Sequence, residues 1–152
     1  MMNKNMRKIL VGIGCLLLFV QIQAQMDTTY VKTTHLFSVK GNESLYLDHY
    51  TALEKVDGEK TPCLIFVFGG AFARGSRDVP KYMPYFNYLV KNGYTVVSID
   101  YRLGLKEASQ QKGLSEEQFA RAFIHAVDIA VEDLFDATRF VLEHAEEWNI
   151  DP

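Results

Sequence analysis

The chain has 152 residues and a formal net charge of −3, and 48% of its residues are hydrophobic while 23% are charged. This composition is that of an ordinary globular domain, and its charge balance gives no sign of a nucleic-acid partner. The length is enough for one hydrophobic core, so we expect one domain at most.

The first residues have the pattern of an export signal. Basic residues precede residues 9–20, the apolar segment ILVGIGCLLLFV, and the small residue Ala24 follows. This order is typical of a secretory signal peptide, and the apolar segment is too short to span a bilayer comfortably. We therefore predict a signal peptide of residues 1–24, cleavage after Ala24, and export to the periplasm or the medium. The mature chain, residues 25–152, is expected to have no membrane span.

The same segment has two other interpretations. An uncleaved N-terminal anchor remains open. A lipoprotein acylated at Cys15 is disfavoured, because Gly12 replaces the leucine expected three positions earlier and the apolar residues continue past the cysteine. Removal of the signal leaves Cys63, at the start of an apolar strand, and we expect it to be a small core residue rather than a nucleophile.

A hairpin and a βαβ unit are expected next. Strand-like residues on both sides of the turn formers Gly41 and Asn42 predict a β-hairpin over residues 33–50, followed by a polar loop. Residues 64–68, LIFVF, have the continuous apolar pattern of a strand buried on both faces in a parallel sheet. A helix over 85–92 and a strand over 94–100 complete a unit whose two strands should be parallel.

A long amphipathic helix is predicted in the last third of the chain. Ser115 and Gln118 have the spacing of a capping box, and apolar residues then recur at helical spacing as far as Trp148. We expect one helix, either straight or kinked, that Asp151 and Pro152 bring to an end.

The glycines after the apolar strand place backbone N–H groups at the carboxyl end of a sheet, where ligands usually bind. Gly70 and Gly75 have the spacing of a phosphate-binding loop, but Ser76 stands where that loop needs lysine, which disfavours nucleotide binding. Acyl transfer also uses exposed N–H groups, because each donor aimed at the carbonyl oxygen stabilises the transition state by about 2.7–4 kcal/mol. A glycine turn without a chemical role remains the alternative.

The segment Phe68-Gly69-Gly70-Ala71 resembles the HGGG loop of the α/β-hydrolase esterases and lipases. The resemblance continues in SLYLDHY (44–50), in VVSIDYRL (96–103) and in the helix that ends at WNIDP, and it covers about residues 44–152. It implies an α/β class chain: the N-terminal portion of an α/β-hydrolase domain, with a β-hairpin leading into a mostly parallel sheet.

The resemblance also implies roles for individual residues. The oxyanion donors would be the N–H groups of Gly70 and Ala71, supported by Gly69. Phe68 replaces the family's histidine, which removes a polar support of the loop, whereas Ala71 in the third glycine position keeps its N–H. Phe72 is a candidate for lining the acyl pocket.

Two charged residues match family positions with a structural role, and a third is expected to assist them. Arg102 and Asp133 would tie the loop after the second parallel strand to the long helix, and Asp100 would hold the same turn. The four histidines do not lie where the family has its catalytic histidine, and no cluster has metal-ligand spacing. We therefore expect no metal and no cofactor, and a small-molecule ester as substrate.

The triad that such an esterase needs is not found in these residues. The sequence contains no G-x-S-x-G motif for the nucleophile. Our first hypothesis is that the intact protein is an exported serine hydrolase of carboxylic esters, that this chain ends before the nucleophile elbow, and that it is inactive alone. The alternative is a noncatalytic exported α/β domain that binds a ligand or a partner.

The signal peptide can be tested by mass. We expect exported protein to begin at Gln25, because the short apolar segment and Ala24 meet the requirements of signal peptidase. Intact-mass analysis of protein recovered outside the cytoplasm checks this. Recovery of the uncleaved chain from membranes would instead establish the anchor.

Overall fold

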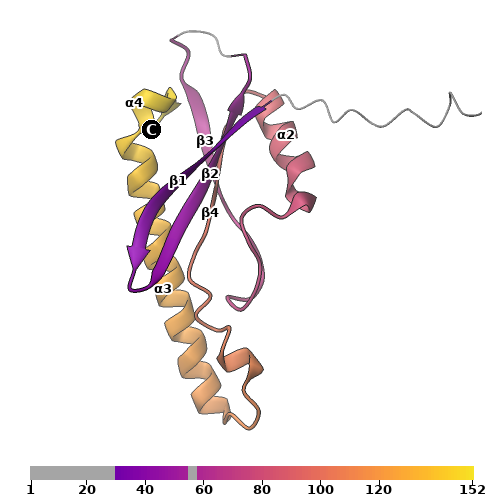
Figure 1. The fold of residues 1–152 in the computed structure, drawn as a ribbon, viewed down its shortest axis with the longest axis vertical. Helices are drawn as coiled ribbons and strands as arrows, with labels where there is room; N and C mark the ends of the chain where they lie inside the picture. Colours follow the sequence, from indigo (N-terminus) through magenta and orange to yellow (C-terminus); the bar gives the residue numbers. More distant parts are fainter. Residues whose placement is uncertain (1–29, 55–57) are drawn as a thin grey trace, which may run out of the picture.

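A computed structural model describes residues 30–54 and 58–152 (Figure 1). The predicted signal peptide therefore lies outside the described residues. The strands are β1 (Tyr30–Lys40), β2 (Glu43–Ala52), β3 (Thr61–Val67), β4 (Thr95–Ile99) and β5 (Ile150–Asp151). The α-helices are α2 (Met83–Lys91), α3 (Glu116–Glu143) and α4 (Ala145–Trp148), and two short 3-10 helices are η2 (Pro80–Tyr82) and η3 (Ala108–Gln110).

The strands form one five-stranded sheet in the order β1-β2-β4-β3-β5. The pairs β1–β2 and β2–β4 are antiparallel, and the pairs β4–β3 and β3–β5 are parallel. The hairpin start and the parallel βαβ unit are thus confirmed. In the described residues the sheet is mixed rather than mostly parallel, because two of its strand pairs are antiparallel and two are parallel.

Helices cover both faces of the sheet, with α2 on one side and α3 and α4 on the other (Figure 1). Successive residues of β4 point to opposite faces, as the pleat requires. Val96 packs against Phe86 and Val90 of α2, while Val97 and Ile99 pack in the core that α3 covers. All five residues of β4 are buried, so β4 is the centre of the fold.

The expectation that residues 64–68 are buried on both faces is wrong for the described chain. β3 is mostly half-buried, and Val67 is 43% exposed. Its second neighbour, β5, pairs only with Thr61 and Pro62, so residues 63–67 of β3 have β4 alone beside them among the described residues. Phe68 lies just beyond the strand and is buried.

The helix starts follow the sequence signals closely. Pro84 lies in the first turn of α2, and Gly93 follows its end with φ +83°. At the start of α3, Ser115 accepts from the N–H of Gln118 at 3.2 Å, and the Gln118 side chain accepts from the N–H of Ser115 at 2.9 Å. The predicted capping box is confirmed. No helix within the described ranges is both long enough and apolar enough to cross a membrane.

The end of the long helix differs from the prediction. α3 ends at Glu143, α4 follows, and Asn149 adopts a left-handed conformation with φ +55°. The carbonyl of Asn149 accepts from the N–H of Thr61 at 2.8 Å, and Ile150 then pairs with Thr61. Ile150 and Asp151 therefore begin a strand beside β3 rather than ending a helix.

Candidate active site

The loop after β3, residues 68–78, has a conformation that most side chains avoid. Ala71 and Phe72 have φ values of +53° and +58°, in the left-handed region that is uncommon for residues other than glycine. A Cβ on Gly70 would lie 1.7 Å from the carbonyl oxygen of Arg74. The second glycine is therefore required by the close approach of the chain to itself, whereas a Cβ on Gly69 would meet no atom within 4 Å.

Several backbone N–H groups of this loop, including those of Gly70 and Ala71, have no acceptor among the described residues. The Gly70 carbonyl accepts from the N–H groups of Ala73 and Arg74 at 3.1 and 3.3 Å. In contrast, no hydrogen bond among the described residues uses the N–H of Gly70 or Ala71 as donor. Gly70 is half-buried and Ala71 is exposed, so the described chain encloses neither residue completely.

Phe68, in the place of the family's histidine, anchors the loop by aromatic packing. Its buried ring stacks on Tyr101, with the ring centres 4.5 Å apart. The Tyr101 hydroxyl donates to the Phe68 carbonyl at 2.9 Å. A Cβ on Gly75 would lie 2.5 Å from the Phe68 ring, so this glycine makes room for the stack. The supporting role of Tyr101 was missed at the sequence level, although its place directly after an apolar strand was a usable signal.

Phe72 packs inward along the same aromatic cluster. Its ring meets Tyr101 and the α3 residue Phe123 edge to face, with ring centres 6.1 and 5.9 Å away. Its carbonyl accepts from the N–H of Leu105 at 3.0 Å. These contacts tie the loop to the segment after β4 and to α3, and a role in an acyl pocket stays a prediction.

Arg77, which the sequence analysis missed, joins the loop to two strands. Its Nη1 lies 2.6 Å from Asp100 Oδ2 at the end of β4, and its Nε lies 3.3 Å from Asp48 Oδ1 on β2. Burial lowers the pKa of the Arg77 guanidinium, but the carboxylates of Asp100 and Asp48 together raise it above its ordinary value. Asp48 is fully buried, and a buried aspartate in the middle of a strand is a signal that a cation lies nearby.

Asp100 contacts β2 and the glycine loop, and its predicted role in holding the loop after β4 stays a prediction. Its carboxylate accepts from the N–H of Tyr46 at 3.2 Å in addition to Arg77, and its own N–H donates to the Tyr46 carbonyl at 2.8 Å. The end of β4 is thus linked both to β2 and to the glycine loop.

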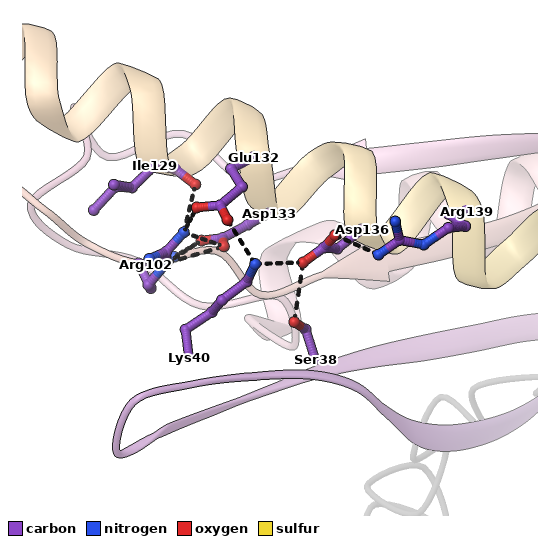
Figure 2. Close-up of polar contacts among 8 residues, drawn as sticks. All are labelled: Ser38, Lys40, Arg102, Ile129, Glu132, Asp133, Asp136 and Arg139. Carbon is purple, nitrogen blue, oxygen red and sulfur yellow. Dashed lines mark hydrogen bonds and ion pairs between the residues drawn. The ribbon is translucent and has the colours of Figure 1, made fainter.

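Arg102 and Asp133 lie together, as Figure 2 shows. The fully buried Asp133 carboxylate accepts from the N–H of Arg102 at 2.8 Å and from its Nε at 2.9 Å. Arg102 also donates to Glu132 and, at 3.2 Å, to the Ile129 carbonyl. Hydrogen bonds to Asp133 and then to Glu132 raise the pKa of the guanidinium above its ordinary value. The segment after β4 is thereby fixed to α3.

The same network reaches the hairpin. Lys40 Nζ lies 2.7 Å from carboxylate oxygens of both Glu132 and Asp136, and the Ser38 hydroxyl donates to Asp136 at 3.1 Å (Figure 2). Arg139 pairs with the other oxygen of Asp136 at 2.7 Å. One acidic stretch of α3 therefore holds both β1 and the segment that follows β4.

A cavity of about 510 Å³ opens between the hairpin turn, the glycine loop and the segment after β4. Phe68 and Gly75 form part of its lining, which also includes both basic and acidic residues: Arg102, Lys106, Glu43, Asp100 and Glu107. The cavity lies at the carboxyl ends of β3 and β4, which is where parallel sheets usually bind ligands.

The histidines do not form a catalytic group in the described part of the chain. His35, His49 and His144 surround Trp148, with ring centres 4.9, 4.3 and 5.1 Å from it, and His125 is exposed on α3. These three rings fill the space between the hairpin and α4.

Cys63 has the properties of a core residue. It is half-buried and not in a disulfide, and burial raises the pKa of its thiol to about 11, which disfavours the nucleophilic thiolate near neutral pH. No group of three or more histidine, cysteine, aspartate or glutamate residues in the ranges that the structure describes is arranged to hold a metal ion.

The two central glycines are expected to respond differently to a methyl group. Gly70→Ala forces the loop away from the Arg74 carbonyl, and we expect it to lower the free energy of unfolding of the intact protein by about 1–3 kcal/mol. Gly69→Ala, the matched control, should change it by less than about 0.5 kcal/mol, because its Cβ has open space. Urea unfolding of both variants measures this difference, and equal losses would contradict the loop geometry described above.

Several known proteins resemble this chain. Thermogutta terrifontis esterase 2 aligns with 84% of it at 23% identity and a TM-score of 0.60, and a bacterial heroin esterase aligns with 93% of it at 19% identity and a TM-score of 0.58. Structures of the Thermogutta esterase include one with propionate bound and one phosphorylated by paraoxon. The cAMP-regulated D2 protein of Dictyostelium discoideum is 36% identical over 63 residues, which are 41% of this chain.

The chain spans 38% of the length of those two esterases and 11% of the length of the D2 protein. At these identities the esterase structures establish the fold, which is that of the α/β hydrolases. The family model BD-FAE matches residues 47–152, well over half of the chain. The chain therefore belongs to the BD-FAE family of esterase-type α/β hydrolases.

Proposed function

We propose that the intact protein is an exported serine hydrolase that cleaves small carboxylic esters, and that the glycine loop described above forms its oxyanion hole. The observation that carries this proposal is the pair of N–H groups of Gly70 and Ala71, which have no protein acceptor in the described chain and lie at the carboxyl end of β3. Membership of the BD-FAE family supports the reaction class.

The proposed chemistry is acyl transfer. When a serine oxygen attacks the ester carbonyl, negative charge develops on the carbonyl oxygen. Two fixed N–H donors stabilise that charge more strongly than they stabilise the neutral carbonyl, so they lower the barrier rather than only improving substrate binding. Ala71 and Phe72 hold a conformation that most side chains avoid, which is the kind of strain often found where a site must be preorganised.

We further propose that the serine, its histidine base and the orienting acid come from chain outside these 152 residues. The absence of a G-x-S-x-G motif in the sequence supports this. So does the register of β5, in which Ile150 lies opposite Thr61 and Asp151 opposite Pro62. A strand that continues in this register runs parallel to β3 toward Gly69 and Gly70, which places a following serine turn beside the two donors.

The proposal can be tested on the protein produced from the complete gene. We expect it to hydrolyse p-nitrophenyl propionate and to be inactivated by paraoxon, since the structurally similar Thermogutta esterase has been obtained with propionate bound and phosphorylated by paraoxon. Peptide mapping should place one diethyl phosphate group on a serine outside residues 1–152. Intact protein that shows neither hydrolysis nor an adduct would favour the noncatalytic binding domain instead.

The contribution of one donor can be isolated by removing a single hydrogen-bonding group. Lactic acid incorporated at position 71 replaces the Ala71 N–H by an ester oxygen and leaves the methyl side chain unchanged. We expect kcat to fall at least about a hundredfold, with KM nearly constant.

The same replacement at Ala73, whose N–H donates to the Gly70 carbonyl, is the control for a weakened backbone, and it should lower kcat much less. Ala71→Gly should change kcat only slightly, because glycine adopts a positive φ without strain and keeps the N–H. Equal kcat values for the position 71 ester and the parent protein would mean that residues 68–71 form only a turn.

A further inference from the structure

We propose that Arg77 is a positioning residue for the oxyanion loop, acting through Asp48 and Asp100 to fix the loop against the sheet. The inference rests on the proposed function, because it assigns to Arg77 the alignment of the two N–H donors. The donors are the N–H groups of Gly70 and Ala71. Arg77 is not one of these donors and is not expected to touch the substrate. Its effect is transmitted by the backbone of residues 70–77.

The side chain of Arg77 bridges two strands that are neighbours in the sheet. Nη1 lies 2.6 Å from the carboxylate of Asp100, which ends β4, and Nε lies 3.3 Å from the carboxylate of Asp48, on β2. Asp48 is fully buried and also contacts the Thr34 hydroxyl at 2.7 Å and Lys32 Nζ at 3.5 Å. A buried carboxylate needs a cation nearby, and Arg77 lies closer to the Asp48 carboxylate than Lys32 does.

The main chain of Arg77 is fixed as well. The Ser98 hydroxyl, on the fully buried β4, donates to the Arg77 carbonyl at 2.8 Å. Both the backbone and the side chain of Arg77 are therefore held by the most buried part of the sheet. This sets where the far end of the glycine loop rejoins the fold.

The other end of the loop is held by Phe68, through its stack on Tyr101 and the hydrogen bond from the Tyr101 hydroxyl to its carbonyl. Between these two anchors the backbone has few contacts in the described chain: those of the Gly70 carbonyl and that of the Phe72 carbonyl with Leu105. The positive φ values of Ala71 and Phe72 persist only if the surroundings impose them. Release of one anchor therefore lets the donors move.

The experiment compares Arg77→Gln with Arg121→Gln in the intact protein. Arg121 is exposed and pairs only with the exposed Glu117 among the described residues, so its substitution removes the same charge without touching the loop. We expect Arg77→Gln to lower kcat for p-nitrophenyl propionate by about tenfold to a hundredfold, with KM within about twofold, since a small misplacement of a catalytic group has effects of this size. Arg121→Gln should leave both constants unchanged.

A second measurement does not depend on activity. The amides of Ala73 and Arg74 donate to the Gly70 carbonyl, and their hydrogen exchange should be accelerated in Arg77→Gln while the amides of β2 and α3 keep their rates. Arg77→Lys should recover part of kcat, because a lysine ammonium reaches one carboxylate but cannot bridge two as the guanidinium fork does. If Arg77→Gln does not fold, Asp48→Asn with Arg77→Gln removes the buried charge together with its partner and is measured instead.

The outcomes separate the two proposals. Loss of kcat together with faster exchange at Ala73 and Arg74 supports the positioning role. A folded variant with unchanged exchange at these amides, or with kcat within twofold of the parent value, overturns it, even if the melting temperature falls. Absence of hydrolysis by the parent protein refutes the proposed function, and in that case the exchange rates alone decide whether Arg77 holds the loop.

Discussion

The parallel pairing of β3 with β4 is the interaction on which the candidate site depends. Five consecutive residue pairs, from Cys63 with Thr95 to Val67 with Ile99, align the two strands so that they end at the same level. Every residue of β4 is buried, because α2 packs on one face of the sheet and α3 on the other. The loops after the two strands therefore start side by side. As a result, the Phe68 ring stacks on Tyr101 and Arg77 forms an ion pair with Asp100.

Buried charges then specify how the loops lie. Asp48 and Asp133 are both fully buried, and each is contacted by an arginine from a loop at the end of a parallel strand. Such pairs add little net stability, because removing the charges from water offsets much of their attraction. Removal of either arginine would, however, leave a buried carboxylate unpaired and strongly lower the free energy of unfolding. These two ion pairs therefore select one loop arrangement more than they stabilise the fold.

The sequence predicted the elements whose signals are local. The capping box at Ser115, the hairpin turn at Gly41 and the apolar β4 segment needed no information about distant residues, and all three are present in the structure. The end of α3 was misplaced because Asn149 adopts its left-handed conformation next to Thr61, 88 positions earlier in the chain. Arg77 was missed for the same reason, since its partners on β2 and β4 are distant in sequence. The pairing of Arg102 with Asp133 was anticipated only through the family resemblance.

Phe68 stands where the resemblance to the HGGG loop implies a histidine, which bears on how the proposed oxyanion loop would respond to pH. A histidine in that position titrates near pH 6.5 unless its surroundings shift it, so a polar support based on it changes with pH. Phe68 carries no ionisable group, and burial raises the pKa of its stacking partner, Tyr101, above the ordinary tyrosine value. The Tyr101 hydroxyl therefore keeps its proton, and its hydrogen bond to the Phe68 carbonyl, throughout the neutral range. At the other anchor, the Arg77 guanidinium is protonated near neutral pH because the ordinary pKa of arginine lies far above that range. The contact between Phe68 and Tyr101 is therefore kept near neutral pH, and under the proposed function the position of the oxyanion loop would not depend on the titration of the histidine base.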